Sequence, residues 1–170
     1  MKQALLFAAF AASLSLHAHA DEHKAHVHGI ARLDVAVDGN MLILHLESPL
    51  DGVLGFEHAP GNAKEHAAVV EMRKKLADAG KLFAPTTAAQ CVLASTQVAA
   101  PTLEAKVGAG AHGDLDADFA FACARPDDLR GMEVLLFKAF PKMRRIDAQV
   151  VSGAGQSAAR LNATKRVLSW

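Results

Sequence analysis

Two segments of alternating apolar and polar residues, separated by a Gly39-Asn40 pair, constrain the fold of this 170-residue chain more than any other feature. In residues 27–37, one face holds Val27, Gly29, Ala31, Leu33, Val35 and Val37. Residues 42–47 alternate in the same way, with leucine at every second position. A period of two is typical of a half-buried strand, and a Gly-Asn pair is typical of a tight turn, so this region predicts a β-hairpin.

A two-residue loop at Gly39 and Asn40 also fixes the register of the hairpin. The predicted pairs are Val37 with Leu42, Val35 with Leu44, Leu33 with Leu46, Arg32 with Glu47, and Asp34 with His45. His45 is therefore expected to form half of a cross-strand charged pair. The same register, extended toward the start of the chain, brings His28 toward Asp51, at the mouth of the loop that follows the second strand.

The rest of the chain predicts one main helix and several more strands. Asn62 and Glu65 form a capping-box pattern and Gly80 is a stop signal, so we expect a helix over residues 63–79. Its apolar face consists of Val69, Met72, Leu76 and Ala79. Strand-like segments cover residues 90–99, 103–107, 115–124, 146–151 and 156–162, and one helical turn is expected at residues 127–130. The predicted fold class is α+β, a largely antiparallel β-sheet built from hairpins with one main α-helix packed on it.

The first 20 residues have the three parts of a secretory signal peptide. Lys2 supplies the positive start, residues 4–16 form an apolar stretch, and Ala18 and Ala20 precede the expected cut. A membrane anchor is the alternative, but a bilayer core needs about 20 apolar residues. We therefore expect residues 1–20 to be cleaved and residues 21–170 to form a single exported domain without a transmembrane segment.

The charge of the chain limits the classes of partner that it can bind, and its cysteines bear on the compartment in which it folds. The chain has 18 basic and 18 acidic residues, and loss of Lys2 leaves the mature domain with a formal charge of −1. Nucleic acids and anionic membranes bind basic surfaces, so neither is an expected partner. Cys91 and Cys123 are the only cysteines, and in an oxidising compartment such a pair predicts one disulfide. A metal or redox pair is the alternative, although there is no C-x-x-C spacing.

Histidines are the residues best suited to bind a metal. Three of them, His23, His26 and His28, cluster at the start of the mature domain. His26 and His28 are two apart in an extended segment, so both rings leave the same face and can converge on one Zn²⁺. Two exposed polar residues at a strand end are the alternative interpretation of this H-x-H pattern.

Further candidate ligands lie in two loops. Glu57 and His58 stand together in residues 55–60, where a solvated loop before a helix is the alternative. His112 lies in a glycine-rich stretch two residues before Asp114, where it could serve as a fourth ligand or orient another one. His66 is on the predicted helix but off its apolar face, so we expect it on the surface.

Cleavage after Ala20 would create one more metal site. The new terminal amine would be followed by Asp21, Glu22 and His23. A histidine at the third position can close a square-planar chelate with the terminal amine and two backbone nitrogens, a geometry that Cu²⁺ and Ni²⁺ prefer. A frayed terminus without a metal is the alternative.

Common enzyme signatures do not occur in the sequence, which has no H-E-x-x-H, G-x-S-x-G, P-loop or dinucleotide-binding motif. Catalytic zinc needs three protein ligands and an open position, which the histidines could supply, so a zinc enzyme is a minor alternative. We expect a binding protein rather than an enzyme.

The motif H-x-H-G at residues 26–29, followed by G-F-E-H-x-P at residues 55–60 and the paired cysteines, resembles the ZrgA-like family of proteobacterial periplasmic proteins. Residues 33–50, residues 137–146 and the terminal Trp170 are also similar, so the resemblance covers essentially the whole mature chain. It implies a periplasmic location and a zinc-linked role, in which members bind zinc and aid its uptake alongside a membrane transporter. By position, it implies metal ligands at His26, His28, Glu57, His58 and His112.

The chain departs from this family around residues 108–112, where members carry a long histidine-rich insert and only His112 stands here. A loop that stores several zinc ions is therefore not expected, whereas a single ordered site is compatible with the sequence. The leading hypothesis is a periplasmic zinc-binding accessory protein of zinc homeostasis or uptake, whose zinc binding weakens as falling pH protonates the imidazoles. The alternative is a non-enzymatic interaction module that docks to a transporter or envelope partner without an essential metal.

Overall fold

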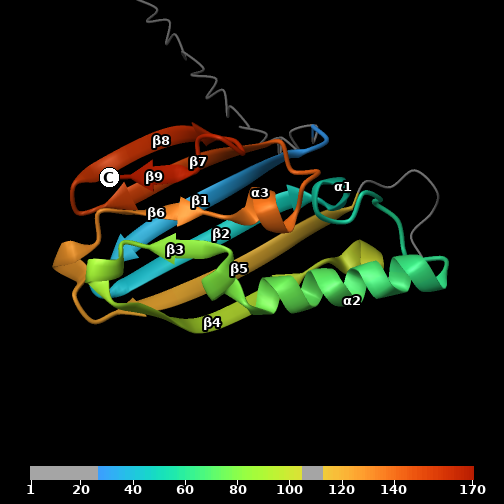
Figure 1. Ribbon diagram of the computed structural model, residues 1–170, viewed down its shortest axis with the longest axis horizontal. Helices are drawn as coiled ribbons and strands as arrows, with labels where there is room; N and C mark the ends of the chain where they lie inside the picture. Colours follow the sequence, from blue (N-terminus) through green and yellow to red (C-terminus); the bar gives the residue numbers. More distant parts are fainter. Residues whose placement is uncertain (1–26, 105–112) are drawn as a thin grey trace, which may run out of the picture.

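The computed structural model describes residues 27–104 and 113–170, and its largest element is a six-stranded sheet (Figure 1). The strands are β1 (Ile30–Asp38), β2 (Met41–Pro49), β4 (Cys91–Ala99), β5 (Asp114–Cys123), β7 (Arg145–Ser152) and β8 (Gly155–Leu161). They lie in the order β4-β5-β2-β1-β7-β8. Every neighbouring pair is antiparallel except β1 and β7, which run parallel. The first strand of the chain therefore lies in the middle of the sheet.

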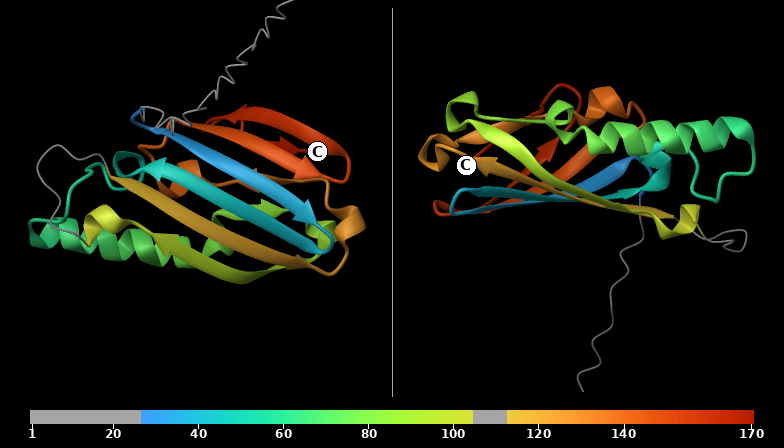
Figure 2. Two further views of the ribbon diagram at one scale, coloured as in Figure 1. Left: turned by 180° about the vertical axis from the view of Figure 1, so that it is seen from behind. Right: turned by 90° about the horizontal axis from the view of Figure 1, so that it is seen from below.

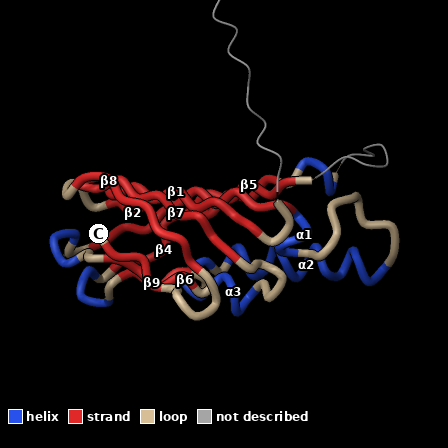
Figure 3. The backbone as a smooth tube through the Cα atoms, turned by 90° about the horizontal axis from the view of Figure 1, so that it is seen from above, coloured by secondary structure: helices blue, strands red, loops and turns tan. Residues whose placement is uncertain are grey.

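A second layer covers one face of this sheet (Figure 2). It contains helix α2 (Ala63–Ala77) and a small sheet of β3 (Phe83–Pro85), β6 (Gly131–Val134) and β9 (Val167–Ser169), in the order β3-β6-β9. The remaining elements are α1 (Leu50–Val53), α3 (Leu136–Ala139) and the 3-10 turns η1 (Ala79–Lys81), η2 (Thr87–Ala89), η3 (Pro101–Leu103) and η4 (Pro126–Asp128). Figure 3 shows α2 and α3 on one side of the large sheet. The predicted α+β class is confirmed.

The core lies between the two layers. Its largest fully buried side chains in the hairpin are Leu33, Leu42, Leu44 and Leu46. Phe119 of β5 packs against Phe83 of β3, with ring centroids 5.1 Å apart. Tilted aromatic pairs add about 1 kcal/mol beyond the burial of their surface, so this contact helps to hold the two sheets together.

The β1–β2 register is the one predicted from the alternating pattern. Leu33 pairs with Leu46, and Asp34 pairs with His45. The predicted partner of the His45 side chain is wrong, however, because its Nδ1 lies 2.7 Å from Oδ1 of Asp118. Asp118 is on β5, the other neighbour of β2, and it is paired with His45 across that ladder. The Asp34 carboxylate binds Arg32 of its own strand instead, with oxygen–nitrogen distances of 2.8 and 3.1 Å.

Helix α2 begins as its capping pattern predicts. The Asn62 side chain accepts a hydrogen bond from the Glu65 amide at 3.0 Å, and the Glu65 carboxylate accepts one from the Gly61 amide at 2.7 Å. Met72 and Leu76 of its apolar face are buried. The helix ends at Ala77, two residues earlier than predicted, because the chain tightens into the 3-10 turn η1. Among the residues described, no helix has both the length and the apolar character needed to cross a bilayer.

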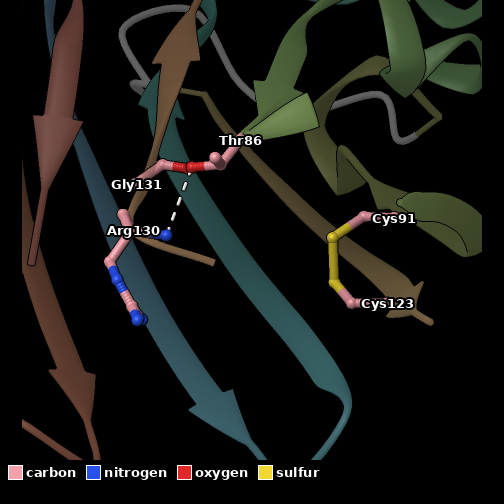
Figure 4. Close-up of a disulfide and its surroundings, with 5 residues drawn as sticks. All are labelled: Thr86, Cys91, Cys123, Arg130 and Gly131. Atoms are coloured by element: carbon pink, nitrogen blue, oxygen red, sulfur yellow. Dashed lines mark hydrogen bonds between the residues drawn. A yellow bond between two sulfur atoms is a disulfide. The ribbon is translucent and has the colours of Figure 1, made fainter. Parts of the chain in front are cut away.

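The predicted disulfide is confirmed. Cys91, at the start of β4, and Cys123, at the end of β5, are cross-strand partners joined through their sulfurs (Figure 4). The same view shows Thr86, whose hydroxyl donates to the Gly131 carbonyl at 2.9 Å and accepts from the Arg130 amide at 3.2 Å. These bonds attach the segment after β3 to the start of β6.

One predicted strand differs from the structure, and three strands of the structure were not predicted. Leu103, the expected start of a strand over residues 103–107, instead ends the 3-10 turn η3 that begins at Pro101. Proline suits the first position of such a turn because it lacks an amide hydrogen. Residues 105–107 lie outside the described part of the chain. The unpredicted strands β3, β6 and β9 have only three or four residues each, too few to show a clear period of two.

Candidate metal site

Three potential metal ligands meet at the open end of the β1–β2 hairpin. His28 lies in the turn that leads into β1, Asp51 lies in the short helix α1 after β2, and Glu57 lies in the loop beyond α1. Each offers one ligand atom, and these three atoms all lie within 4.8 Å of one another. The pairing of β1 with β2 therefore brings the segment before β1 and the segment after β2 together, and both supply members of the group.

The imidazole of His28 lies between the two carboxylates. Its Nε2 is 3.5 Å from Oε1 of Glu57, and its Nδ1 is 3.8 Å from Oδ2 of Asp51. Ligand atoms around a tetrahedral Zn²⁺ stand about 3.4 Å apart when each bond is about 2.1 Å long. Only one ring nitrogen of His28 can bind a given ion, and the three ligand atoms that the residues offer lie within 4.8 Å of one another. Side-chain rotations that shorten these separations would place the donors around one ion.

Exposure differs between the acids and the histidine. The side chain of His28 is 57% exposed, whereas those of Asp51 and Glu57 are 24% and 13% exposed. The carboxylates thus form the recessed side of the site, and the imidazole lies on the side of solvent. Recessed carboxylates attract a cation more strongly than fully solvated ones, because less water screens their charge.

Glycines allow the segments of the site to approach closely. Gly29 has a φ of +74°, and its amide donates to Oδ1 of Asp51 at 3.3 Å. A Cβ on Gly113 would lie 2.8 Å from the carbonyl oxygen of Glu57, and the Gly113 carbonyl accepts from the Leu50 amide at 2.8 Å. The backbone before β5 is therefore packed directly against the loop that presents Glu57.

Two cationic side chains border the same region. The ammonium group of Lys142 lies against Gly55, in space that a side chain at that position would fill. Arg144 lies against Gly29 and donates to the His28 carbonyl at 2.5 Å. Both come from the segment between α3 and β7, so that segment forms one wall of the site.

Comparison with protein families gives one match. The model of the family described as "ZrgA family zinc uptake protein" matches residues 25–170. The chain belongs to this family. No curated protein matches it. Membership of the ZrgA family relates the protein to zinc uptake, and the group formed by His28, Asp51 and Glu57 lies within the matched region.

The structure brings together some of the ligands that the sequence and the ZrgA resemblance predict. His28 and Glu57 are in the group. His58 is turned elsewhere: its Nδ1 is 2.9 Å from the carbonyl oxygen of Ala59, and its ring stacks on Phe56 with centroids 5.1 Å apart. These contacts of the His58 ring are therefore with residues of its own loop and not with His28, Asp51 or Glu57.

Other predicted sites lie outside the described ranges. These are the ligands His26 and His112 and the N-terminal copper or nickel chelate of Asp21, Glu22 and His23. They stay predictions. His66 is exposed on α2, as expected.

Asp51 was not predicted as a ligand. The signal was nevertheless available, because the register of the hairpin already brought His28 toward Asp51. Acidic side chains are common without a metal, and it is the closeness of Asp51 to both His28 and Glu57 that makes it a candidate.

Proposed function

We propose that this ZrgA family member is a periplasmic, non-enzymatic zinc-binding protein that assists zinc uptake. In this proposal Zn²⁺ is the cargo, held by His28, Asp51 and Glu57 and delivered to a membrane transporter. His26 and His112 remain proposed additional ligands. The observation that supports it most directly is the convergence of one imidazole and two carboxylates from three separate segments.

The chemistry of the donor set suits Zn²⁺. Imidazole nitrogen and carboxylate oxygen are both zinc ligands, with bonds of about 2.0–2.2 Å. Two ionised carboxylates offset the double charge of the ion, and a neutral imidazole adds a ligand without adding charge. The complex formed by these three side chains would therefore be close to neutral.

The exposure of the site suits a cargo that must be released. The His28 side chain is 57% exposed, so a partner can reach the ion from the side of solvent. A partner that supplies its own ligands can then replace the imidazole first and the recessed carboxylates afterwards. A deeply enclosed site would instead slow the exchange of the ion.

The proposal is tested by zinc titration of the purified mature protein in competition with a chromophoric chelator. The wild type is expected to bind Zn²⁺ stoichiometrically. His28→Ala is expected to lower the affinity by at least about tenfold, since loss of a group that merely supports a ligand already costs that much. The same titration of His26→Ala and His112→Ala tests the two additional ligands.

His66→Ala is the matched control, because His66 is an exposed histidine on α2 outside the group. It is expected to bind zinc like the wild type. If the wild type does not bind Zn²⁺, or if His28→Ala and Glu57→Gln both bind it as the wild type does, the proposed site is wrong. Absence of binding would favour an interaction module that docks without a metal.

A further inference from the structure

We propose that Arg144 is a positioning residue of the metal site, which fixes the His28-Gly29 backbone so that the imidazole faces Asp51 and Glu57. This inference rests on the proposed function, because it concerns how the same site is held in place. Arg144 itself offers no ligand atom, since a guanidinium is always charged and has only donors.

The main chain of Arg144 binds the backbone of Gly29. The amides of Arg144 and Arg145 both donate to the Gly29 carbonyl, at 2.8 and 3.1 Å. They begin the parallel pairing of β1 with β7, in which Ile30 is the partner of Arg145. The backbone on the C-terminal side of His28 is thus fixed by a strand from the other end of the chain.

The side chain of Arg144 binds the backbone of His28. Its Nη2 donates to the carbonyl oxygen of His28 at 2.5 Å. A Cβ on Gly29 would lie only 2.7 Å from Nε of Arg144, so the guanidinium lies in the space that a side chain at this position would fill. The side chain and the main chain of one residue therefore hold two consecutive carbonyl groups.

Gly29 connects the Arg144 clamp, meaning the hydrogen bonds of Arg144 to the carbonyls of His28 and Gly29, to a carboxylate of the site. Its amide donates to Oδ1 of Asp51 at 3.3 Å, which leaves Oδ2 as the oxygen nearer to His28, at 3.8 Å from Nδ1. Rotation of the His28-Gly29 peptide would change both the direction of the imidazole and the support of Asp51. Fixing this peptide consequently orients two of the three donors together.

The sign of the effect separates positioning from charge. A cation beside a cation site repels the ion, so if Arg144 acted only through its charge, its removal would tighten zinc binding. If Arg144 positions His28, its removal weakens zinc binding, because the ligand must then be ordered when the ion binds. Partners of metal ligands typically change affinity by about 10- to 100-fold.

The experiment compares zinc affinities of Arg144→Gln, Arg144→Lys and the wild type in the full mature protein. Arg144→Gln is expected to bind Zn²⁺ about tenfold more weakly. Arg144→Lys keeps the charge but loses the planar fork, so it is also expected to bind more weakly than the wild type. Arg160→Gln is the matched control, since Arg160 pairs with Asp147 on the sheet and not with the site.

Two further measurements make the outcome decisive. In a His28→Ala background, Arg144→Gln is expected to cause a smaller loss of affinity than in the wild type, because the part of its effect that passes through His28 is already gone and only the support of Asp51 is left. In the metal-free protein, Arg144→Gln is expected to speed hydrogen exchange of the Gly29 amide while the melting temperature stays close to that of the wild type.

The inference is overturned if Arg144→Gln binds Zn²⁺ as tightly as the wild type or more tightly while His28→Ala loses affinity. It is also overturned if Arg144→Gln and His28→Ala lower the affinity additively. Failure of the proposed function looks different, because then His28→Ala itself leaves zinc binding unchanged or the wild type does not bind zinc. The hydrogen exchange of Gly29 reports on the clamp in either case.

Discussion

Nε2 of His28 lies 3.5 Å from Oε1 of Glu57, although one residue precedes the β1–β2 hairpin and the other follows it. An antiparallel hairpin returns the chain to its starting point, so the segments at its open end become neighbours. The short helix α1 and the turn after it then place Asp51 and Glu57 on either side of the imidazole. The candidate site is therefore a product of strand register as much as of loop conformation.

Replacing Asp51 should affect zinc binding more than replacing His58. The Asp51 carboxylate lies 3.8 Å from His28, whereas the His58 ring is held by the Ala59 carbonyl and by Phe56. Asp51→Asn is expected to lower zinc affinity about tenfold and His58→Ala to change it little. A chelator competition assay measures both. A larger loss of zinc affinity in His58→Ala than in Asp51→Asn would contradict this prediction and favour His58, the ligand implied by the resemblance, over Asp51.

Removal of the disulfide should destabilise the fold without changing the site. Cys91 and Cys123 are 32 residues apart, and closing a loop of this size contributes about 4 kcal/mol. Cys123 also donates its amide to the Asn40 carbonyl at the hairpin turn, at the end of the sheet away from His28. The double variant Cys91→Ser, Cys123→Ser should unfold at lower denaturant concentration and bind zinc like the wild type. Reduced zinc affinity in the folded variant would contradict this separation.

Truncation of Phe119 should weaken the contact between the two sheets. Phe119 is 1% exposed and packs against Phe83. Phe119→Ala is expected to cost about 3–5 kcal/mol of unfolding free energy, because it leaves a cavity between the layers. Val151→Ala is the control, since Val151 is 51% exposed and its truncation should change stability by less than about 0.5 kcal/mol. Urea denaturation followed by circular dichroism measures both, and equal losses would contradict the assigned core.

Glu65 should make the start of α2 less stable in acid. The Gly61 amide donates to the Glu65 carboxylate, and this hydrogen bond, helped by one from Asn62, holds the pKa of Glu65 below its ordinary value. A lowered folded-state pKa contributes stability above the unfolded-state pKa, and this contribution is lost as the pH falls through the folded-state pKa. The stability difference between the wild type and Glu65→Gln should therefore shrink as the pH falls through that range. Denaturation at neutral and acidic pH checks this, and a difference that grows in acid would contradict it.

The hairpin and its register could be predicted because local pattern determines them. Alternation fixes which residues face the core, and a two-residue turn at Gly39 and Asn40 leaves one register in which the leucines pair. That register also indicated the approach of His28 to Asp51, so part of the site followed from local sequence alone. The helix start followed from the Asn62 cap in the same way.

The features that were missed depend on distant parts of the chain. Asp118 binds His45 because β5 lies on the other side of β2, and nothing in the hairpin sequence identifies its second neighbour. The parallel pairing of β1 with β7 is likewise nonlocal, and it is the source of the Arg144 contact with His28. His58 looked like a ligand because it follows Glu57, but a one-residue step in a loop can turn a side chain away from its neighbour.

The parallel pairing of β1 with β7 also determines when the site can form during folding. His28, Asp51 and Glu57 are all made early in synthesis, but the partner of Ile30 is Arg145, near the other end of the chain. Contacts between such distant residues form late, because a long loop must be closed before they contribute stability. A chain that crosses a membrane unfolded would thus have an incompletely ordered site until its last strands arrive. The protein would then bind its metal only after folding on the far side of the membrane. It would not carry zinc out of the compartment where the chain is made.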